Sequence, residues 1–389
     1  MSDDLVPVLP ESAERDPAAH LRLSEQPLRI AQVAPPMEAV PPAGYGGTER
    51  IVAELIDELT RRGHSVTLFA SGDSTARCEL VPTVPAALRP LGFNSDPTGY
   101  LAATIAQVRA RQTDFDVIHS HLEWANLMLM RSTVTPSVAT FHGRLDQPWA
   151  TDALSDPPPG LVAISRSHAA THPEVPWAGV VYNGLNLEGA PFERRRSDAL
   201  CFVGRIAPEK GVVDAIEIAR LSGRPLRIVA KLGPTAVEQE YAETVFKPAL
   251  ERADVEFLGE LGSAERDAIL ASSHALLMPG TWPEPFGLVA IEAMACGTPV
   301  VARRSGALPE IVRDGIDGFL GDDPANLAFL LERVDGLDRE RIRADVMDRF
   351  SARRMVDGYL EVYRRRLAGE DEPPGADRLL HLPSIASGA

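Results

Sequence analysis

The chain of 389 residues is 44% hydrophobic and 24% charged, a balance that excludes wholesale disorder, and its length suits two domains. A formal net charge of −16 argues against sequence-independent nucleic-acid binding, which needs a positive field, and against an overall polybasic membrane surface. No apolar run reaches the roughly 20 residues of a membrane span, the acidic N-terminus lacks the layout of a signal peptide, and the three cysteines form no CxxC motif. These features predict a cytoplasmic protein whose membrane contact is at most peripheral.

The first half of the chain alternates short apolar strands with helices after a polar start. Residues 1–27, rich in Pro, Glu, Asp and Ser, predict a flexible tail. Apolar residues recur at helical spacing between Thr48, the expected N-cap, and Gly63, and a second helix is expected near 97–112. Strands are predicted at 28–34, 66–70, 116–119, 138–141, 161–164 and 180–182.

A second series of the same kind follows a linker-like stretch at 183–198. Strands are predicted at 200–203, 226–230, 255–258, 275–278 and 299–302, and helices near 210–222, 237–252, 263–273, 287–296, 307–313 and 324–334. A long amphipathic helix within 351–369 precedes a second predicted tail, 370–389. Strands that alternate with helices are typical of a parallel sheet covered on both faces. The sequence therefore predicts an α/β protein with two facing Rossmann-like domains, 28–183 and 184–350.

The strongest chemical signal is the segment EPFGLVAIE, which runs from Glu284 to Glu292 directly after a predicted strand. Ligands of parallel sheets bind outside the carboxyl ends of the strands. Gly287 and Leu288 would present free backbone N–H groups at a helix start, a natural site for phosphate. Glu292 lies in an otherwise apolar helix, where an isolated carboxylate is costly. Its expected partner is a pair of ribose hydroxyls, and the alternative is an arginine in the core.

This segment resembles the E-x7-E signature of the retaining glycosyltransferases of family four, also called glycosyl transferases group 1, which have the GT-B fold. The resemblance spans roughly 28–367. It implies that Glu284 touches hydroxyls of the donor sugar, that Glu292 holds the ribose, and that Phe286 lines the same donor site. It also implies that the first domain binds the acceptor, the second binds the nucleotide sugar, and the helix at 351–369 crosses back to the first domain.

A second motif, FVGRIAPEKG, places Arg205 and Lys210 in one loop between a strand and a helix. Two cations there can stabilise a departing diphosphate without a metal ion. The segment resembles the family's G-R-x-x-x-x-K-G motif, which assigns both residues to the donor and to catalysis. The alternative interpretation is a surface loop with two solvated charges.

Glycines after the first strand form a third candidate. The segment GYGGTE does not match the dinucleotide fingerprint, so it gives little support for NAD. Gly46 and Gly47 allow the backbone to approach a phosphate closely, and their position resembles the family's Gly-Gly loop, which contacts the donor from the opposing domain. An ordinary strand-to-helix turn is the alternative. In the second domain, the segment ending at Leu261 resembles the one whose backbone meets the base.

Three histidines follow predicted strands: His119 and His121 in DVIHSHLEW, and His142 in ATFHG. The His-x-His spacing invites a zinc interpretation, but no third ligand is clearly spaced, with only Glu123 or His142 available. The resemblance places a histidine at the second position, so His121 is expected near the donor sugar and the acceptor. It makes His142 a candidate wall of the acceptor pocket, and we expect His119 to be structural.

The sequence as a whole predicts a retaining hexosyltransferase. It would move a sugar from a nucleoside diphosphate sugar, with UDP favoured, to an unidentified acceptor, without a metal or other cofactor. The expected catalytic residues are Glu284, His121, Arg205 and Lys210. Two alternatives stay open: a nucleotide-sugar epimerase on the same fold, and a nucleotide-sugar-binding protein without catalysis. The sequence indicates no oligomeric state.

Overall fold

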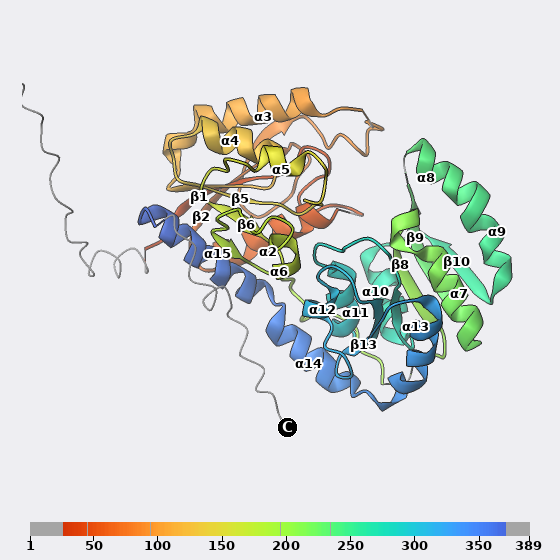
Figure 1. Ribbon diagram of the computed structural model, residues 1–389. Coiled ribbons are helices and arrows are strands. Elements are labelled where there is room, and N and C mark those ends of the chain that lie inside the picture. Colours follow the sequence, from red (N-terminus) through yellow and green to blue (C-terminus); the bar gives the residue numbers. More distant parts are fainter. Residues whose placement is uncertain (1–25, 45, 94, 195, 234, 371–389) are drawn as a thin grey trace, which may run out of the picture.

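The computed structural model describes residues 26–370 except 45, 94, 195 and 234. The two predicted tails therefore fall, apart from residues 26, 27 and 370, outside the described residues. Two separate sheets organise the fold (Figure 1). The seven-stranded sheet has the order β3-β2-β1-β4-β5-β6-β7, and the six-stranded sheet has the order β10-β9-β8-β11-β12-β13. All pairs of these named strands run parallel, which confirms the predicted α/β fold with two Rossmann-like domains.

The first domain is built on the seven-stranded sheet. Its elements are β1 (Arg29–Val33), α2 (Gly47–Arg61), β2 (Ser65–Ser71), β3 (Glu79–Val84), α3 (Thr98–Ala110), β4 (Val117–Ser120), α4 (Ala125–Ser132), β5 (Ser137–Thr140), α5 (Ala150–Ala153), β6 (Leu161–Ala163), α6 (Arg166–Ala169) and β7 (Gly179–Val180). The N-cap of α2 is Gly46, two residues before the predicted cap, because the carbonyl of Gly46 accepts the first helical hydrogen bond from the backbone N–H of Arg50 at 3.1 Å. The prediction of Thr48 as N-cap is therefore wrong.

The second domain is built on the six-stranded sheet. Its strands are β8 (Leu200–Ile206), β9 (Leu226–Leu232), β10 (Val255–Gly259), β11 (Leu276–Met278), β12 (Val300–Arg303) and β13 (Gly318–Gly321). Its main helices are α7 (Val212–Ser222), α8 (Ala236–Tyr241), α9 (Lys247–Ala249), α10 (Ser263–Ser272), α11 (Leu288–Ala295), α12 (Leu308–Ile311), α13 (Pro324–Leu330) and α14 (Arg339–Arg349). Short 3-10 helices at Pro208–Lys210 (η2), Leu250–Arg252 and Leu331–Gly336 complete it.

The predicted helix over 237–252 is present as one helical run whose winding changes along its length. It consists of α8, a π-helical turn at Ala242–Phe246, α9 and a 3-10 turn. Pro248 has no backbone N–H to donate, so the regular α-helical hydrogen-bond series cannot pass through it.

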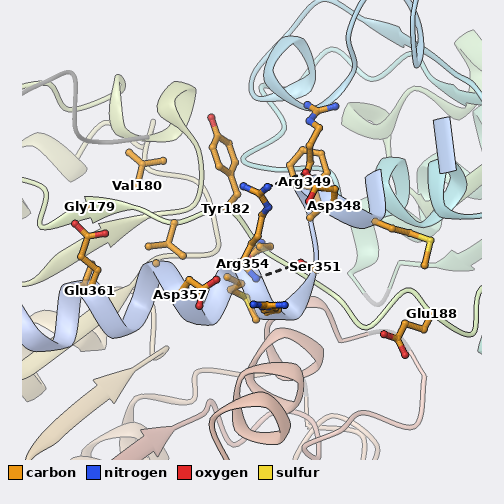
Figure 2. Close-up of a pocket in the computed structure, with 18 of the residues that line it drawn as sticks. Gly179, Val180, Tyr182, Glu188, Asp348, Arg349, Ser351, Arg354, Asp357 and Glu361 are labelled. Atoms are coloured by element: carbon orange, nitrogen blue, oxygen red, sulfur yellow. Dashed lines mark hydrogen bonds and ion pairs between the residues drawn. The ribbon is translucent and has the colours of Figure 1, made fainter. Parts of the chain in front are cut away.

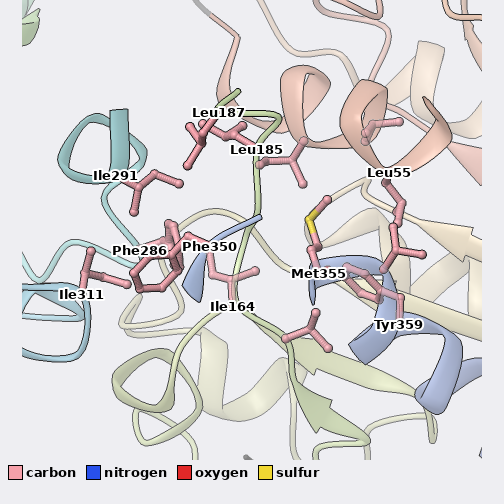
Figure 3. Packing of buried hydrophobic residues seen from close by; sticks show 14 of the residues in the cluster. Leu55, Ile164, Leu185, Leu187, Phe286, Ile291, Ile311, Phe350, Met355 and Tyr359 are labelled. Carbon is pink, nitrogen blue, oxygen red and sulfur yellow. The ribbon is translucent and has the colours of Figure 1, made fainter. Parts of the chain in front are cut away.

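The two domains share one hydrophobic core at their junction (Figure 3). Leu185 in the linker and Phe350 just before the last helix lie side by side, and the backbone N–H of Leu185 donates to the Phe350 carbonyl at 3.0 Å. The final helix, α15 (Ala352–Leu367), then crosses from the second domain to the first and packs against α2 (Figure 1). The predicted crossover helix is confirmed, and it carries fully buried tyrosines into the first domain.

Candidate functional site

The predicted site residues gather where the strand order of each sheet reverses. In the first sheet this point lies between β1 and β4, and in the second between β8 and β11. Chain segments that follow neighbouring strands diverge there to opposite faces of the sheet, which leaves a crevice at the carboxyl ends of the strands. Gly46 and His121 follow the first pair of strands, whereas Lys210 and Glu284 follow the second.

Glu284 lies at the centre of a compact charged cluster in the second domain. The Lys210 ammonium donates a hydrogen bond to Glu284 Oε2 at 2.7 Å, and the indole N–H of Trp282 donates to the same oxygen at 2.7 Å. The Lys210 nitrogen also lies 4.4 Å from the centre of the Trp282 ring, within cation–π range. Glu284 and Lys210 are each only 19% exposed. A carboxylate held by a cation and an indole is a fixed, charged surface for a polar ligand.

Trp282 also joins the two domains. The Arg144 guanidinium, on the loop after β5 in the first domain, lies 5.3 Å from the Trp282 ring centre. Arg144 is held in turn by two hydrogen bonds of 2.6 Å to Asp146. No sequence motif included Trp282 or Arg144. An aromatic residue two positions before Glu284 could have indicated Trp282. The contact between Trp282 and Arg144 places the loop after β5 at the charged cluster.

Helix α11 begins beside this cluster. Gly287, its N-cap, has φ 103°, a backbone conformation that favours glycine. Across the crevice, a Cβ at Gly47 would lie 3.6 Å from the Leu288 side chain; within the loop itself, one at Gly46 would lie 2.7 Å from Pro42. The structure thus brings the glycine loop of the first domain against the start of α11, and its role in donor binding stays a prediction.

Glu292 is 6% exposed and is paired with two arginines. Arg50 of α2 forms a salt bridge to Glu292 Oε1 from the first domain, and Arg266 of α10 reaches the same oxygen at 3.1 Å. Burial also lowers the pKa of Arg50. The structure therefore shows the alternative partner, an arginine, in place. The ribose role of Glu292 stays a prediction.

Three other predicted donor residues occupy less central positions. Arg205 pairs with Glu209 at 3.0 Å and with Glu238 at 3.1 Å, within its own domain. The Phe286 side chain is 2% exposed and packs into the junction core, its ring centre 5.8 Å from that of Phe350. Leu261 lies half-buried in the loop between β10 and α10. Their predicted roles in donor binding stay predictions.

The three histidines stack in the first domain below the crevice. His119 is fully buried, with Tyr363 Oη at 2.7 Å from Nδ1 and Thr140 Oγ1 at 2.8 Å from Nε2, a satisfied structural position as expected. His121 is also fully buried, and its Nδ1 lies 2.9 Å from His142 Nε2. His142 alone is half-exposed. Of the two histidines assigned to the substrates, His142 presents the more accessible ring.

The zinc alternative finds no set of ligands here. Across the described part of the chain, no three His, Cys, Asp or Glu side chains are grouped so as to hold a metal ion. Glu123, the suggested further ligand, is instead partly buried and accepts hydrogen bonds from the backbone N–H groups of His142 at 3.2 Å and Gly143 at 3.1 Å. Burial raises the pKa of Glu123 to about 7.

A cavity of about 610 Å³ lies away from these residues, at the junction of the domains (Figure 2). It is lined mainly by the chain from Gly179 to Asn183, by the end of α14 and by the first turns of α15. None of the predicted site residues lines it. Within residues 26–370, leaving the undescribed positions aside, no helix has the length and apolar character to cross a membrane.

Comparisons with known proteins agree with this geometry. Residues 45–188 match the family model described as Glycosyltransferase Family 4, and residues 190–350 match the model described as Glycosyl transferases group 1. A D-inositol 3-phosphate glycosyltransferase of Acidothermus cellulolyticus is 30% identical over 92% of this chain and 95% of its own length.

Solved structures extend the likeness to the fold. AviGT4, a glycosyltransferase of avilamycin A biosynthesis, has 27% identity and a TM-score of 0.66 over 88% of this chain and 99% of its own. Anabaena Alr3699/HepE, solved in complex with UDP-glucose, has a TM-score of 0.65 over 86% of this chain and 98% of its own, at 19% identity. The chain therefore has the GT-B fold and belongs to glycosyltransferase family 4, within the group 1 glycosyl transferases.

Proposed function

We propose that this glycosyltransferase moves a hexose-type sugar from a UDP-sugar to a hydroxyl group of a polyhydroxylated acceptor, with retention of the anomeric configuration. One observation carries the proposal: the Glu284 carboxylate is fixed by Lys210 and Trp282 beside the start of α11, opposite the glycine loop. The donor named for the Anabaena neighbour, UDP-glucose, and the inositol phosphate acceptor named for the Acidothermus relative support the choice of substrates.

The donor would lie with its diphosphate between the glycine loop and the start of α11. The Lys210 ammonium and the free N–H groups at the helix start would stabilise the charge that develops on the diphosphate. Arg205 would add a second cation after leaving its carboxylate partners. Glu284 would hold hydroxyls of the sugar. Because these groups supply the positive charge themselves, we propose that transfer needs no metal ion.

In the transfer step, the oxygen of the acceptor hydroxyl forms a bond to the anomeric carbon, and the bond from that carbon to the diphosphate oxygen breaks. Attack from the face that the diphosphate leaves preserves the configuration. The proton of the hydroxyl passes to the departing diphosphate oxygen, so charge and atoms balance. Closure of the domains around the donor excludes water that would otherwise hydrolyse it.

Binding of the ribose at Glu292 requires a rearrangement. Both guanidinium partners of Glu292 contact Oε1, and Arg50 comes from the opposite domain. A ribose hydroxyl pair would take the place of Arg50 on this carboxylate, which would free the guanidinium for the nearby diphosphate. Family membership favours this transfer chemistry over the epimerase and the non-catalytic alternatives.

The test compares two lysine variants with the same chemical change. UDP-glucose, UDP-N-acetylglucosamine, GDP-mannose and ADP-glucose are offered with myo-inositol phosphates, and release of the nucleoside diphosphate is followed with and without EDTA. We expect Lys210→Met to lower kcat by about 10²–10³-fold, the usual loss when one stabilising donor is removed. Lys247→Met, which breaks only an exposed pair with Glu243, should retain wild-type activity.

Proton NMR of the product reports its anomeric configuration. Near-normal turnover by Lys210→Met, an inverted product, or activity abolished by EDTA would each contradict the corresponding part of the proposal.

A further inference from the structure

A continuous series of hydrogen-bonded side chains connects the crossover helix α15 to the crevice of the first domain. It is fully buried except at its last member, which is half-exposed. In order, the series runs through Thr140, His119, Tyr363, Gln32, His121 and His142. Of these residues, only Tyr363 belongs to α15, and its hydroxyl contacts Gln32 of β1 and His119 of β4, which are register partners in the first sheet.

The amide of Gln32 fixes the direction of this series. Gln32 Oε1 can only accept, so the Nε2 of His121, 3.0 Å away, carries a proton and donates it. Gln32 Nε2 can only donate, and it donates to Tyr363 Oη at 3.2 Å. The Tyr363 hydroxyl also lies 2.7 Å from His119 Nδ1, to which its own hydrogen is free to point.

The direction determines which ring nitrogens are bare. Burial lowers the pKa of His121 and brings that of His142 to about 3, so both imidazoles are neutral at pH 7 and carry one proton each. Since the proton of His121 is on Nε2, its Nδ1 is bare and accepts from His142 Nε2 at 2.9 Å. The proton of His142 is thus on Nε2 as well, and its Nδ1 is bare. Among the residues that the structure describes, no group bonds to this Nδ1.

The histidine that carries this bare nitrogen stands at the edge of the crevice. His142 follows β5, and two residues later Arg144 lies over Trp282, which donates to Glu284. His142 is the partly exposed end of an otherwise buried series, so its imidazole is the member of the series that a ligand between the domains can reach.

Resting on the proposed function, we propose that Tyr363 is a positioning residue of this enzyme: acting through Gln32 and His121, it leaves Nδ1 of His142 bare to accept a hydrogen bond from an acceptor hydroxyl. This hydroxyl is a second one beside the reacting hydroxyl, whose proton goes to the diphosphate. The substrate class that the site selects is therefore a polyol with neighbouring hydroxyl groups, such as a sugar or a cyclitol.

The experiment uses two tyrosines of the same helix. The full-length protein is labelled with ¹⁵N-histidine, and long-range proton–nitrogen spectra distinguish protonated from bare ring nitrogens, with signals assigned through His121→Gln and His142→Gln. In the wild type we expect both histidines to be protonated on Nε2 only. Tyr363→Phe removes the hydroxyl that accepts the hydrogen bond from Gln32 Nε2. The Gln32 amide then no longer has one fixed orientation, so we expect mixed tautomers at both histidines. We also measure transfer by Tyr363→Phe to a polyol that the wild type glycosylates. The KM for this acceptor should rise about tenfold, while the KM for the donor stays unchanged.

Tyr359→Phe is the matched control. Tyr359 is as fully buried as Tyr363, but within the described part of the chain its hydroxyl bonds only to Thr140, at 3.0 Å, beyond His119 at the far end of the series. We expect wild-type tautomers at His121 and His142 and a wild-type acceptor KM.

A wild-type spectrum with His142 protonated on Nδ1, or a Tyr363→Phe spectrum identical to that of Tyr359→Phe, would overturn the inference. The spectra need no substrate, so they decide it separately from the proposed function, which fails if the wild type transfers no sugar.

Discussion

Glu284 and Lys210 were predicted from the sequence as residues of the candidate site, whereas Trp282 was not. The sequence motifs identify Glu284 and Lys210 as charged groups that follow strands, and the structure places them 2.7 Å apart. The contact between Trp282 and Arg144 was not predicted, because it joins loops of two domains that are far apart in the sequence. The spacing of residues in a sequence does not indicate such contacts.

Glu123 offers a test at the scale of one carboxyl group. It is partly buried with φ 51°, and desolvation raises its pKa to about 7, against about 4.3 for an exposed glutamate. As the pH rises, the unfolded chain therefore releases this proton at a lower pH than the folded protein does. The stability that this group contributes is fully present below about pH 4.3 and is lost as the pH rises through 7.

Glu123→Gln should remove this loss. We expect its free energy of unfolding to exceed that of the wild type by up to about 3 kcal/mol at pH 8, with the difference shrinking toward pH 4. Urea denaturation across this pH range measures it. Glu251→Gln, at an exposed position, should show no such trend. A difference for Glu123→Gln that stays constant with pH would contradict the assignment.

At the scale of elements, the sequence predicts the helices and strands whose apolar residues recur at a clear, regular spacing. The strands that flank both crevices and the apolar helix after Glu284 were predicted within a few residues. Six of the labelled helices and strands were missed: β3, α4, α5, α6, β13 and α14. Strand β3 lies at a sheet edge, is half-exposed and contains Pro82, so its apolar pattern is weak. Helix α14 buries only Arg339, Ile342 and Val346, too few for a clear helical pattern.

Gly287 tests whether the start of α11 needs its unusual backbone. An alanine there would adopt an unfavourable positive φ, and its Cβ would lie 3.2 Å from the Leu308 side chain. We expect Gly287→Ala to lower the free energy of unfolding by about 1–2 kcal/mol and to weaken nucleotide binding, as measured by urea denaturation and calorimetry. Gly189→Ala, where a Cβ would meet nothing within 4 Å, is the control. Equal stability of both variants would refute this role.

At the scale of the whole molecule, contacts across the crevice hold the domains together. Besides the Arg50–Glu292 pair, Glu310 of the second domain accepts hydrogen bonds from the backbone N–H groups of Arg166 and Ser167 at 2.9 and 2.6 Å and from the Tyr182 hydroxyl at 2.6 Å. The sequence predicted two facing domains but none of these links, since they depend on how the domains are oriented.

These links make the proposed donor site depend on both domains at once. The glycine loop and Arg50 come from the first domain, whereas Lys210, Glu284 and Glu292 come from the second. Above all, we propose that a nucleoside diphosphate binds between them, with its ribose on Glu292.

Calorimetric titration with UDP, GDP and ADP tests this claim most directly, on the wild type and on Glu292→Gln. We predict that one nucleotide, expected to be UDP, binds at one site per chain. Glu292→Gln should weaken its binding about tenfold or more, because hydrogen bonds to a charged group are lost. No binding of any of the three nucleotides, or equal affinity in the wild type and Glu292→Gln, would contradict it.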